Sequence, residues 1–169
     1  MQKKSFVIPL ALVLMAGILL VPLVSAATYG ITSVTSWGTW PNGTVANYNN
    51  IRYSSPDNAY AQITSGNPSQ SGAGGYITGY VGSVPAGSNI QIYAFSPAGY
   101  YSKVHVYVST SSSGPWTEIG TGLTVSGGPG WFNFGYCAQS FSYVNAASIH
   151  EGGQPSNVYI DCVRITQPP

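Results

Sequence analysis

Charged side chains are scarce in this 169-residue sequence: Asp, Glu, Lys and Arg make up 5% of it, where soluble domains carry about 25%. After residue 26 the charged residues are Arg52, Asp57, Lys103, Glu118, Glu151, Asp161 and Arg164. So few cations cannot neutralise a run of phosphates, which argues against nucleic-acid binding. The surface must consist mainly of Ser, Thr, Gly, Asn, Gln and Tyr. Such a surface hydrogen-bonds well and repels weakly, so it suits contact with copies of itself or with sugar.

Catalytic and cofactor motifs are also missing. The sequence has no G-x-S-x-G, no H-E-x-x-H, no Cys/His zinc spacing, no P-loop and no dinucleotide fingerprint. The four acids of the chain are scattered, so no carboxylate pair for glycoside hydrolysis is apparent. We therefore expect no enzyme and no catalytic cofactor. Asp57 and Asp161 are weak candidates for holding a structural calcium ion, although Asp57 after Pro56 is equally typical of a turn.

Only one long hydrophobic run is present, from Phe6 to Leu23. It follows Lys3 and Lys4 and ends in the small-residue sequence Val24-Ser25-Ala26, which is typical of a secretory signal. An uncleaved membrane anchor is the alternative, because the run is nearly long enough to span a bilayer. We expect residues 1–26 to be a cleaved signal peptide. The mature protein, residues 27–169, is then secreted, extracellular or on the cell surface, and not in the membrane.

Cysteine is rare too, with only Cys137 and Cys162. In an oxidising compartment two cysteines predict one disulfide. Two buried thiols, or a bridge between neighbouring chains, are the alternatives. Asn42-Gly43-Thr44 is an N-glycosylation sequon, and Asn42 is a candidate for modification. The same Asn-Gly pair is also a strong turn signal.

Proline and glycine are abundant, and their spacing leaves no room for helices of average length. The short runs between them are rich in Val, Ile, Thr and aromatic residues, which predicts a single all-β domain over 27–169. In the run 103–109, Val104, Val106 and Val108 should point to one face. In the closing strand 158–165, Val158, Ile160 and Cys162 should share a face. Further strands are expected at 31–37, 45–53, 59–63, 76–81, 89–95, 116–119, 131–136 and 141–144.

Aromatic residues are plentiful, with 13 Tyr and 4 Trp. In a β protein they fill the core, stack on sugar rings or form contacts between subunits. By default Trp116, Trp131, Phe132 and Phe134 are expected in the core. The aromatic residues that we expect to contact a partner or ligand are Trp37, Trp40, Tyr100 and Tyr101.

Two segments together resemble a known pattern: Val104-His105-Val106-Tyr107-Val108-Ser109, then Gly114-Pro115-Trp116-Thr117-Glu118-Ile119-Gly120. They are similar to discoidin-like and carbohydrate-binding-module-like domains of the galactose-binding-like class. The segments Ser55 to Ala61 and Ser156 to Ile165 resemble the early segment and the closing strand of the same domains. The resemblance spans roughly residues 45 to 166 and implies an antiparallel jelly-roll β-sandwich, with no fixed ligand residues. A second resemblance, in composition alone, is to microbial surface-layer and archaeal sheath proteins.

These features favour a non-catalytic structural protein of the cell envelope that self-assembles into a sheath, layer or filament. Its partners would be copies of itself, joined through uncharged strand edges, with residues 27–44 as the edge in contact. The alternative is a stand-alone carbohydrate-binding or adhesion module, whose partner would be a cell-surface polysaccharide.

Overall fold

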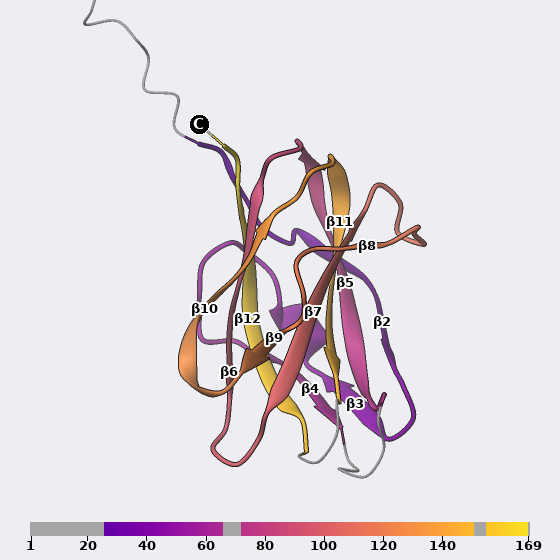
Figure 1. Cartoon of the computed structure of the whole chain (residues 1–169), viewed down its shortest axis with the longest axis vertical. Helices are drawn as coiled ribbons and strands as arrows, with labels where there is room; N and C mark the ends of the chain where they lie inside the picture. The colour runs from indigo at the N-terminus through magenta and orange to yellow at the C-terminus, as the bar shows by residue number, and fades with distance from the viewer. Residues whose placement is uncertain (1–25, 66–71, 151–154, 169) are drawn as a thin grey trace, which may run out of the picture.

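A computed structural model describes residues 26–65, 72–150 and 155–168 of the chain. Within these ranges the protein is built from two six-stranded antiparallel sheets packed face to face (Figure 1). Sheet I has the order β10-β6-β12-β4-β3, with β1 also paired to β12, and sheet II has the order β2-β5-β11-β7-β8, with β9 also paired to β7. The expected signal peptide, residues 1–26, lies outside the described residues except for residue 26.

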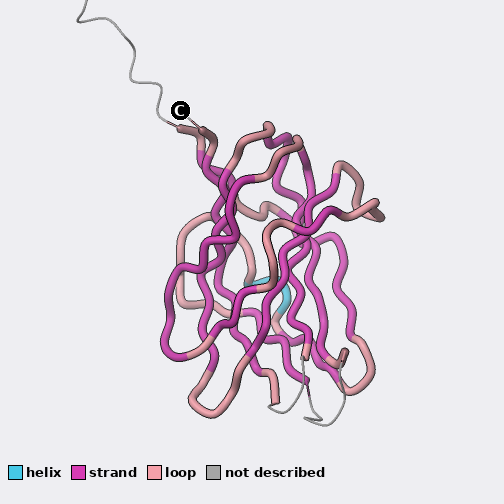
Figure 2. The backbone as a smooth tube through the Cα atoms, viewed as in Figure 1, coloured by secondary structure: helices cyan, strands magenta, loops and turns pink. Residues whose placement is uncertain are grey.

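The strands of sheet I are β1 (Thr28–Tyr29), β3 (Gly43–Ala46), β4 (Ala61–Ser65), β6 (Asn89–Ser96), β10 (Gly127–Tyr136) and β12 (Asn157–Thr166). Those of sheet II are β2 (Ser33–Thr39), β5 (Gly74–Val84), β7 (Ser102–Ser109), β8 (Thr117–Glu118), β9 (Leu123–Val125) and β11 (Phe141–Ile149). A 3-10 turn, η1 (Tyr48–Asn50), is the helical element drawn in Figure 2. In the described part of the chain no helix is long and apolar enough to cross a membrane. The predicted all-β sandwich is confirmed.

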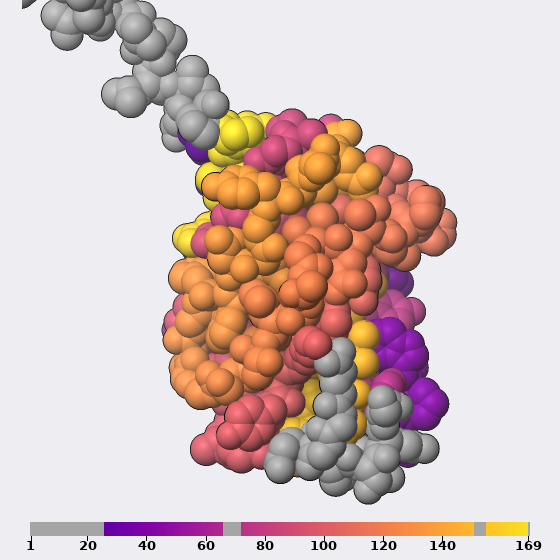
Figure 3. All heavy atoms as spheres, viewed as in Figure 1, coloured from indigo at the N-terminus to yellow at the C-terminus, as the bar shows by residue number. Residues whose placement is uncertain are grey.

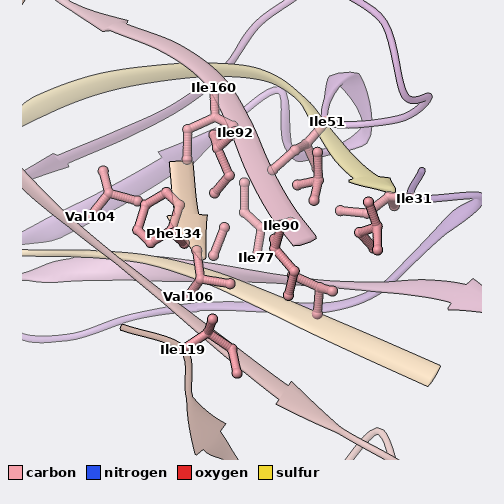
Figure 4. Close-up of a cluster of buried hydrophobic side chains, with 14 of the residues drawn as sticks. Ile31, Ile51, Ile77, Ile90, Ile92, Val104, Val106, Ile119, Phe134 and Ile160 are labelled. Atoms are coloured by element: carbon pink, nitrogen blue, oxygen red, sulfur yellow. The ribbon is translucent and has the colours of Figure 1, made fainter. Parts of the chain in front are cut away.

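The core between the sheets is almost entirely aliphatic (Figure 4). Val104, Val106 and Val108 all point into it, as the alternation in β7 predicts. Sheet I faces them with side chains of β4, β6 and β12: Ala61, Ile63, Ile90, Ile92, Ala94, Val158, Ile160, Val163 and Ile165. Phe134 and Phe141 are the largest aromatic side chains that it buries.

None of the 13 Tyr and 4 Trp residues, all of which lie in the described ranges, is buried. The expectation for the core holds for Phe134 and partly for Phe132, which packs against the core from its rim. It is wrong for Trp116 and Trp131, which are half-exposed. Because branched aliphatic residues fill the narrow space between the sheets, the tyrosines and tryptophans lie on outer faces, edges and loops.

A β-bulge at Asp161 divides β12 into two registers. Ile160 lies opposite Ala94, whereas Cys162 already lies opposite Tyr93, so Asp161 is the extra residue. The predicted grouping of Cys162 with Val158 and Ile160 is therefore wrong. After the bulge, Val163 and Ile165 join the core, and Cys162 is buried outside it on the other side of sheet I.

The predicted disulfide is not formed: Cys137 and Cys162 are free thiols. Cys137 belongs to the core cluster and its Sγ donates to the carbonyl of Gln139 at 3.0 Å. Cys162 is turned away from the core by the bulge. Burial raises the pKa of Cys137 above its usual range and that of Cys162 to about 12, so both thiols stay protonated at neutral pH.

The N-terminal segment is shared between the two sheets. β1 pairs with β12 at the end of the chain (Figure 1), Ile31 enters the core, and β2 then forms an edge of sheet II. The expected strand 45–53 is wrong beyond Ala46, because Asn47 adopts a left-handed conformation (φ 52°) and the chain turns into η1. An uncharged edge strand therefore exists where the composition suggested one.

Candidate functional site

The outer face of sheet II is lined with aromatic and polar side chains in register across its central strands. Successive side chains of a strand point to opposite faces, so the outward positions are those between the core residues. One row joins Thr78, Asn145 and Tyr107 on β5, β11 and β7. The neighbouring row joins Tyr76, Ala147 and His105.

A pocket of about 380 Å³ lies over these rows, and we call it the sheet II groove. Its lining comes from four strands and two loops: Ser36, Trp40, Tyr76, Thr78, Tyr107, Ser112, Ser113, Trp116, Asn145 and Ala147. The floor consists of the strand residues. The two tryptophans come from connections at opposite sides of the sheet, after β2 and before β8. The groove thus crosses sheet II between two indole rings.

The Trp40 side of the groove is fixed by a tight turn. Gly43 N–H donates to the Trp40 carbonyl at 2.9 Å, so Pro41 and Asn42 are the central residues of the turn, and Asn42 takes the left-handed conformation (φ 60°). The Asn-Gly pair predicts a turn centred one residue later, on Asn42 and Gly43. Trp40 N–H donates to the Gly74 carbonyl at 3.0 Å, and its ring lies 5.7 Å from that of Tyr76. Both backbone bonds restrain the orientation of the indole.

Tyr76 itself depends on a glycine across the sheet. A Cβ on Gly38 would come within 2.7 Å of the Tyr76 ring, so only glycine leaves room for the ring to lie over β2. The aromatic floor at this end of the groove therefore rests on a residue without a side chain.

The Trp116 side is carried by the loop between β7 and β8, which projects from the body of the sandwich (Figure 3). Directly after β8, Ile119 anchors the segment: its side chain is buried and its N–H donates to the Val106 carbonyl at 2.8 Å. Gln139 Nε2 donates to Thr117 Oγ1 at 3.0 Å, and the hydroxyls of Ser111 and Ser113 lie 3.1 Å apart. These contacts hold Trp116 against the edge of sheet II.

Polar contacts fix the side chains in the floor of the sheet II groove and at its edge. Asn145 Nδ2 donates to Thr78 Oγ1 at 2.9 Å, which fixes the orientation of the amide. At the margin, His105 Nδ1 lies 2.6 Å from Glu118 Oε1, and Gly122 packs so closely on the His105 ring that a Cβ there would collide with it. Flat aromatic faces with amide and hydroxyl groups between them suit a ligand that has both apolar faces and many hydroxyls.

The outer face of sheet I also carries aromatic residues, but these pack on one another. Trp131 lies edge-on to Tyr93 at 5.2 Å, and the Arg164 guanidinium lies 3.8 Å above the Trp131 ring. Arg164 Nε and Nη2 both donate to Gln91 Oε1, at 3.0 and 2.7 Å. The indole is therefore covered by neighbours of its own chain.

A second cluster continues across the same face. Phe95 and Tyr159 stack at 4.7 Å with 8° between their planes, and Tyr60 meets Phe95 edge-on at 5.0 Å. Gln62 Nε2 donates to Tyr159 OH at 2.9 Å and to Asn157 Oδ1 at 3.0 Å. We call this set, together with Trp131, Tyr93, Arg164 and Gln91, the sheet I network.

Of the four aromatic residues predicted to contact a partner, the structure places only Trp40 in the groove. Trp37 is 46% exposed on the other side of β2, where it stacks on Tyr48 at 4.9 Å. Tyr100 and Tyr101 lie in the loop between β6 and β7, and Tyr101 is 58% exposed. These residues are not brought together.

Sequence reasoning missed most of the groove, namely Tyr76, Thr78, Tyr107, Trp116 and Asn145. The signal available was alternation. Tyr76 and Thr78 flank Ile77, and Tyr107 lies between two core valines, so an outward polar or aromatic position could be assigned to each strand. The alternation did not indicate which strands pair, so it could not show that these residues lie together.

The structure does bring the two calcium candidates together. Asp161 is fully buried, and its carboxylate oxygens accept the backbone N–H groups of Asp57 at 3.1 Å and Asn58 at 2.8 Å. Burial raises the pKa of Asp161, and the two amides lower it. Among the described residues, no group of three or more His, Cys, Asp or Glu side chains is arranged to hold a metal ion.

Comparison with known proteins shows the fold alone. No family model and no curated protein matches this chain. One similar structure is a truncated protein with a family 32 carbohydrate-binding module and an alginate lyase domain (TM-score 0.53, 11% identity, 84% of this chain and 34% of that one). This chain thus spans about a third of that protein's length.

Two others are similar over nearly their whole length. They are the C-terminal family 6 carbohydrate-binding module of a marine laminarinase from Zobellia galactanivorans (TM-score 0.50, 12% identity, 84% of this chain and 99% of that one) and a pectin-binding carbohydrate-binding module (TM-score 0.50, 14% identity, 77% and 91%). The resemblance in composition to surface-layer and sheath proteins gains no support from these comparisons. The chain has the jelly-roll β-sandwich fold found in carbohydrate-binding modules.

Proposed function

We propose that this protein binds carbohydrate through the sheet II groove. The observation that carries the proposal is the groove itself: two tryptophans from opposite sides of the sheet enclose a floor of Tyr, Thr and Asn side chains. Indole and phenol rings stack on the apolar C–H faces of sugar rings, and amide and hydroxyl groups bond the sugar hydroxyls.

The neighbours in fold support the same function, since they include a pectin-binding module and the module of a laminarinase. The proposal is for a binding protein without a catalytic step, because the described residues that line the groove include no carboxylate, histidine or cysteine. The location that fits is outside the cell, as the expected signal peptide implies, with polysaccharide as the partner.

A matched pair of tryptophans tests the proposal. In pull-down with insoluble polysaccharides and in calorimetry with soluble oligosaccharides, the unmodified protein should bind at least one glycan. Trp40→Ala should weaken that binding by about 2 kcal/mol, or roughly thirty-fold, which is the cost of truncating a central aromatic contact. Trp37→Ala removes an exposed indole from the other side of β2 and should leave the affinity unchanged. Equal losses in both variants would refute the assignment of the groove.

Self-assembly is the second candidate function, and the edge strand β2 favours it. β2 closes one side of sheet II, most of its residues are exposed, and it carries no charge. Such an edge is able to pair with a strand of another copy. If it does, the protein should form concentration-dependent oligomers in analytical ultracentrifugation, and lysines at the exposed positions Ser33 and Thr39 should abolish them. A protein that remains monomeric at high concentration contradicts this second candidate.

A further inference from the structure

We infer that the sheet II groove selects uncharged glycan chains and rejects uronic-acid polymers, an inference that rests on the proposed function. The fold does not decide this choice, because the similar structures include both a pectin-binding module and the module of a laminarinase. The choice is set by the charges that this chain places around its own groove.

Among the described residues, the groove offers no cationic partner for a carboxylate. The ten described residues that line it are Ser, Thr, Asn, Ala, Tyr and Trp, and none of these ten is Lys, Arg or His. A uronate carboxylate that enters such a site loses water without gaining a cation, which is unfavourable. A neutral sugar loses only hydroxyl–water bonds, and the amide of Asn145 and the serine hydroxyls can replace them.

Every cation after residue 26 is located elsewhere. Arg164 lies in the sheet I network, on the opposite side of the sandwich, bonded to Gln91 and stacked over Trp131. Arg52 lies beyond η1, where its Nη2 donates to Asn49 Oδ1 at 3.0 Å.

Lys103 is the remaining cation, and it lies on the same outer face as the groove. It is in register with Ile149 on β11 and with Thr124 on β9, one row beyond the Ala147 row that forms the floor. It does not line the groove.

The nearest charge in the rows of the floor is negative. Glu118 on β8 lies directly opposite Tyr107, a floor residue, and its side chain is 38% exposed. Its carboxylate is hydrogen-bonded to His105, which lies in the adjacent row beside Ala147. An acidic sugar over Tyr107 would therefore meet a carboxylate rather than a cation, and the repulsion adds to the lost hydration.

The test compares neutral and acidic oligosaccharides of equal length by calorimetry. Hexamers of β-glucan, xylan and mannan form the neutral set, and hexagalacturonate and hexaguluronate form the acidic set. Both sets are measured in roughly 10 mM salt, where the Debye length is about 30 Å and charge effects are largest. We expect a neutral hexamer to bind with an affinity that does not change as salt is raised, and the acidic hexamers not to bind.

A charge variant tests the cause. Ser112→Arg places a cation in the wall of the groove and should raise the affinity for an acidic hexamer at least tenfold, with the gain lost in high salt. Ser55→Arg is the control, because it adds the same charge at an exposed loop position outside the groove.

The possible outcomes distinguish failure of the inferred selectivity from failure of the proposed carbohydrate binding. Binding of a neutral hexamer only, with a gain specific to Ser112→Arg, supports the inference. Acidic hexamers that bind the unmodified protein as tightly as neutral ones overturn the selectivity and leave carbohydrate binding intact. A gain no larger for Ser112→Arg than for Ser55→Arg overturns it too. Failure of both sets to bind overturns the proposed function and the inference together.

Discussion

The two outer faces of this sandwich carry similar aromatic side chains in different surroundings. On the sheet I face these side chains pack on one another, and on the sheet II face they line a groove. On the sheet I face, Trp131 is covered by Arg164 and packs on Tyr93. On the sheet II face, Trp40 and Trp116 enclose an open groove. An aromatic residue on a β face is therefore not by itself a binding residue. What distinguishes the two faces is whether the chain's own side chains already occupy the ring faces.

This difference depends on the aliphatic core. Because Ile, Val and Ala side chains fill the space between the sheets, every tyrosine and tryptophan remains outside it. One face can then use its aromatic residues for stability, and the other can keep them for a ligand. The low charge of the chain fits this arrangement, since Gln, Asn, Ser and Thr make the polar contacts on both faces.

The largest expected effect comes from exchanging a tryptophan for alanine on each face. Trp131→Ala removes the ring contacts with Tyr93 and Arg164, so the free energy of unfolding should fall by roughly 2–3 kcal/mol. Glycan affinity should not change. Denaturant unfolding and calorimetry on the same variant measure the two quantities.

Trp116→Ala is the reciprocal variant. It should lower the affinity by about 2 kcal/mol and the free energy of unfolding by less than about 1 kcal/mol, because Ile119 and the β8 pairing remain. If Trp131→Ala weakened binding and Trp116→Ala did not, the assignment of the two faces would be reversed.

An effect on stability that is no larger than that of Trp131→Ala is expected at the bulge of β12. Asp161→Asn leaves only one side-chain oxygen for the backbone N–H groups of Asp57 and Asn58. Near pH 3 the Asp161 carboxyl is protonated, and both of its oxygens can still accept a bond, whereas the nitrogen of an amide cannot. Leaving one backbone N–H without an acceptor should cost about 2 kcal/mol of unfolding free energy. Glycan binding on the other sheet should be unaffected.

The pH dependence of this difference has a definite sign. Burial raises the pKa of Asp161 above its usual value, despite the two amides. The stability that comes from a raised carboxyl pKa is fully present below the usual Asp value of about 4 and is lost as the pH rises through the folded-state value. The advantage of the unmodified protein over Asp161→Asn should therefore shrink between acid and neutral pH in denaturant titrations. An advantage that grows with pH would contradict the raised pKa.

The fold could be predicted from local patterns, and its irregularities could not. The alternation of Val104, Val106 and Val108 and the spacing of proline and glycine predict strands. The bulge at Asp161 was missed because the amides that bond its side chain belong to Asp57 and Asn58, more than 100 positions away in the sequence. Without the bulge, the faces of β12 and the position of Cys162 were assigned wrongly.

The groove was predictable only in part, for a similar reason. Trp40 was predicted to contact a partner because it lies in the uncharged N-terminal segment. Trp116 was assigned to the core by default. Its actual position depends on β8 pairing with β7 and on the anchor at Ile119. Strand pairing across the sheet decides which outward residues lie next to one another. The local patterns of a single sequence do not reveal that pairing.

The smallest expected effect concerns one amide on each face, each bonded to a hydroxyl. Asn145 donates to Thr78 in the floor of the groove, and Gln62 donates to Tyr159 in the sheet I network. Asn145→Ala should lower glycan affinity by about 1 kcal/mol, or roughly fivefold, because a bound sugar loses one polar contact. Gln62→Ala should leave the affinity unchanged and lower the free energy of unfolding by about 1 kcal/mol.

Both variants lose an amide of similar chemistry, so a difference in glycan affinity between them depends on the face that carries the amide. Calorimetry with the preferred oligosaccharide and urea unfolding give the two readouts for each variant. Asn145→Ala should also cost some stability, since Thr78 is buried and loses its donor. The decisive quantity is therefore the affinity. A loss of affinity in Gln62→Ala equal to that in Asn145→Ala would mean that both faces contact the glycan, and that the sheet I network is a second binding surface rather than a self-contained one.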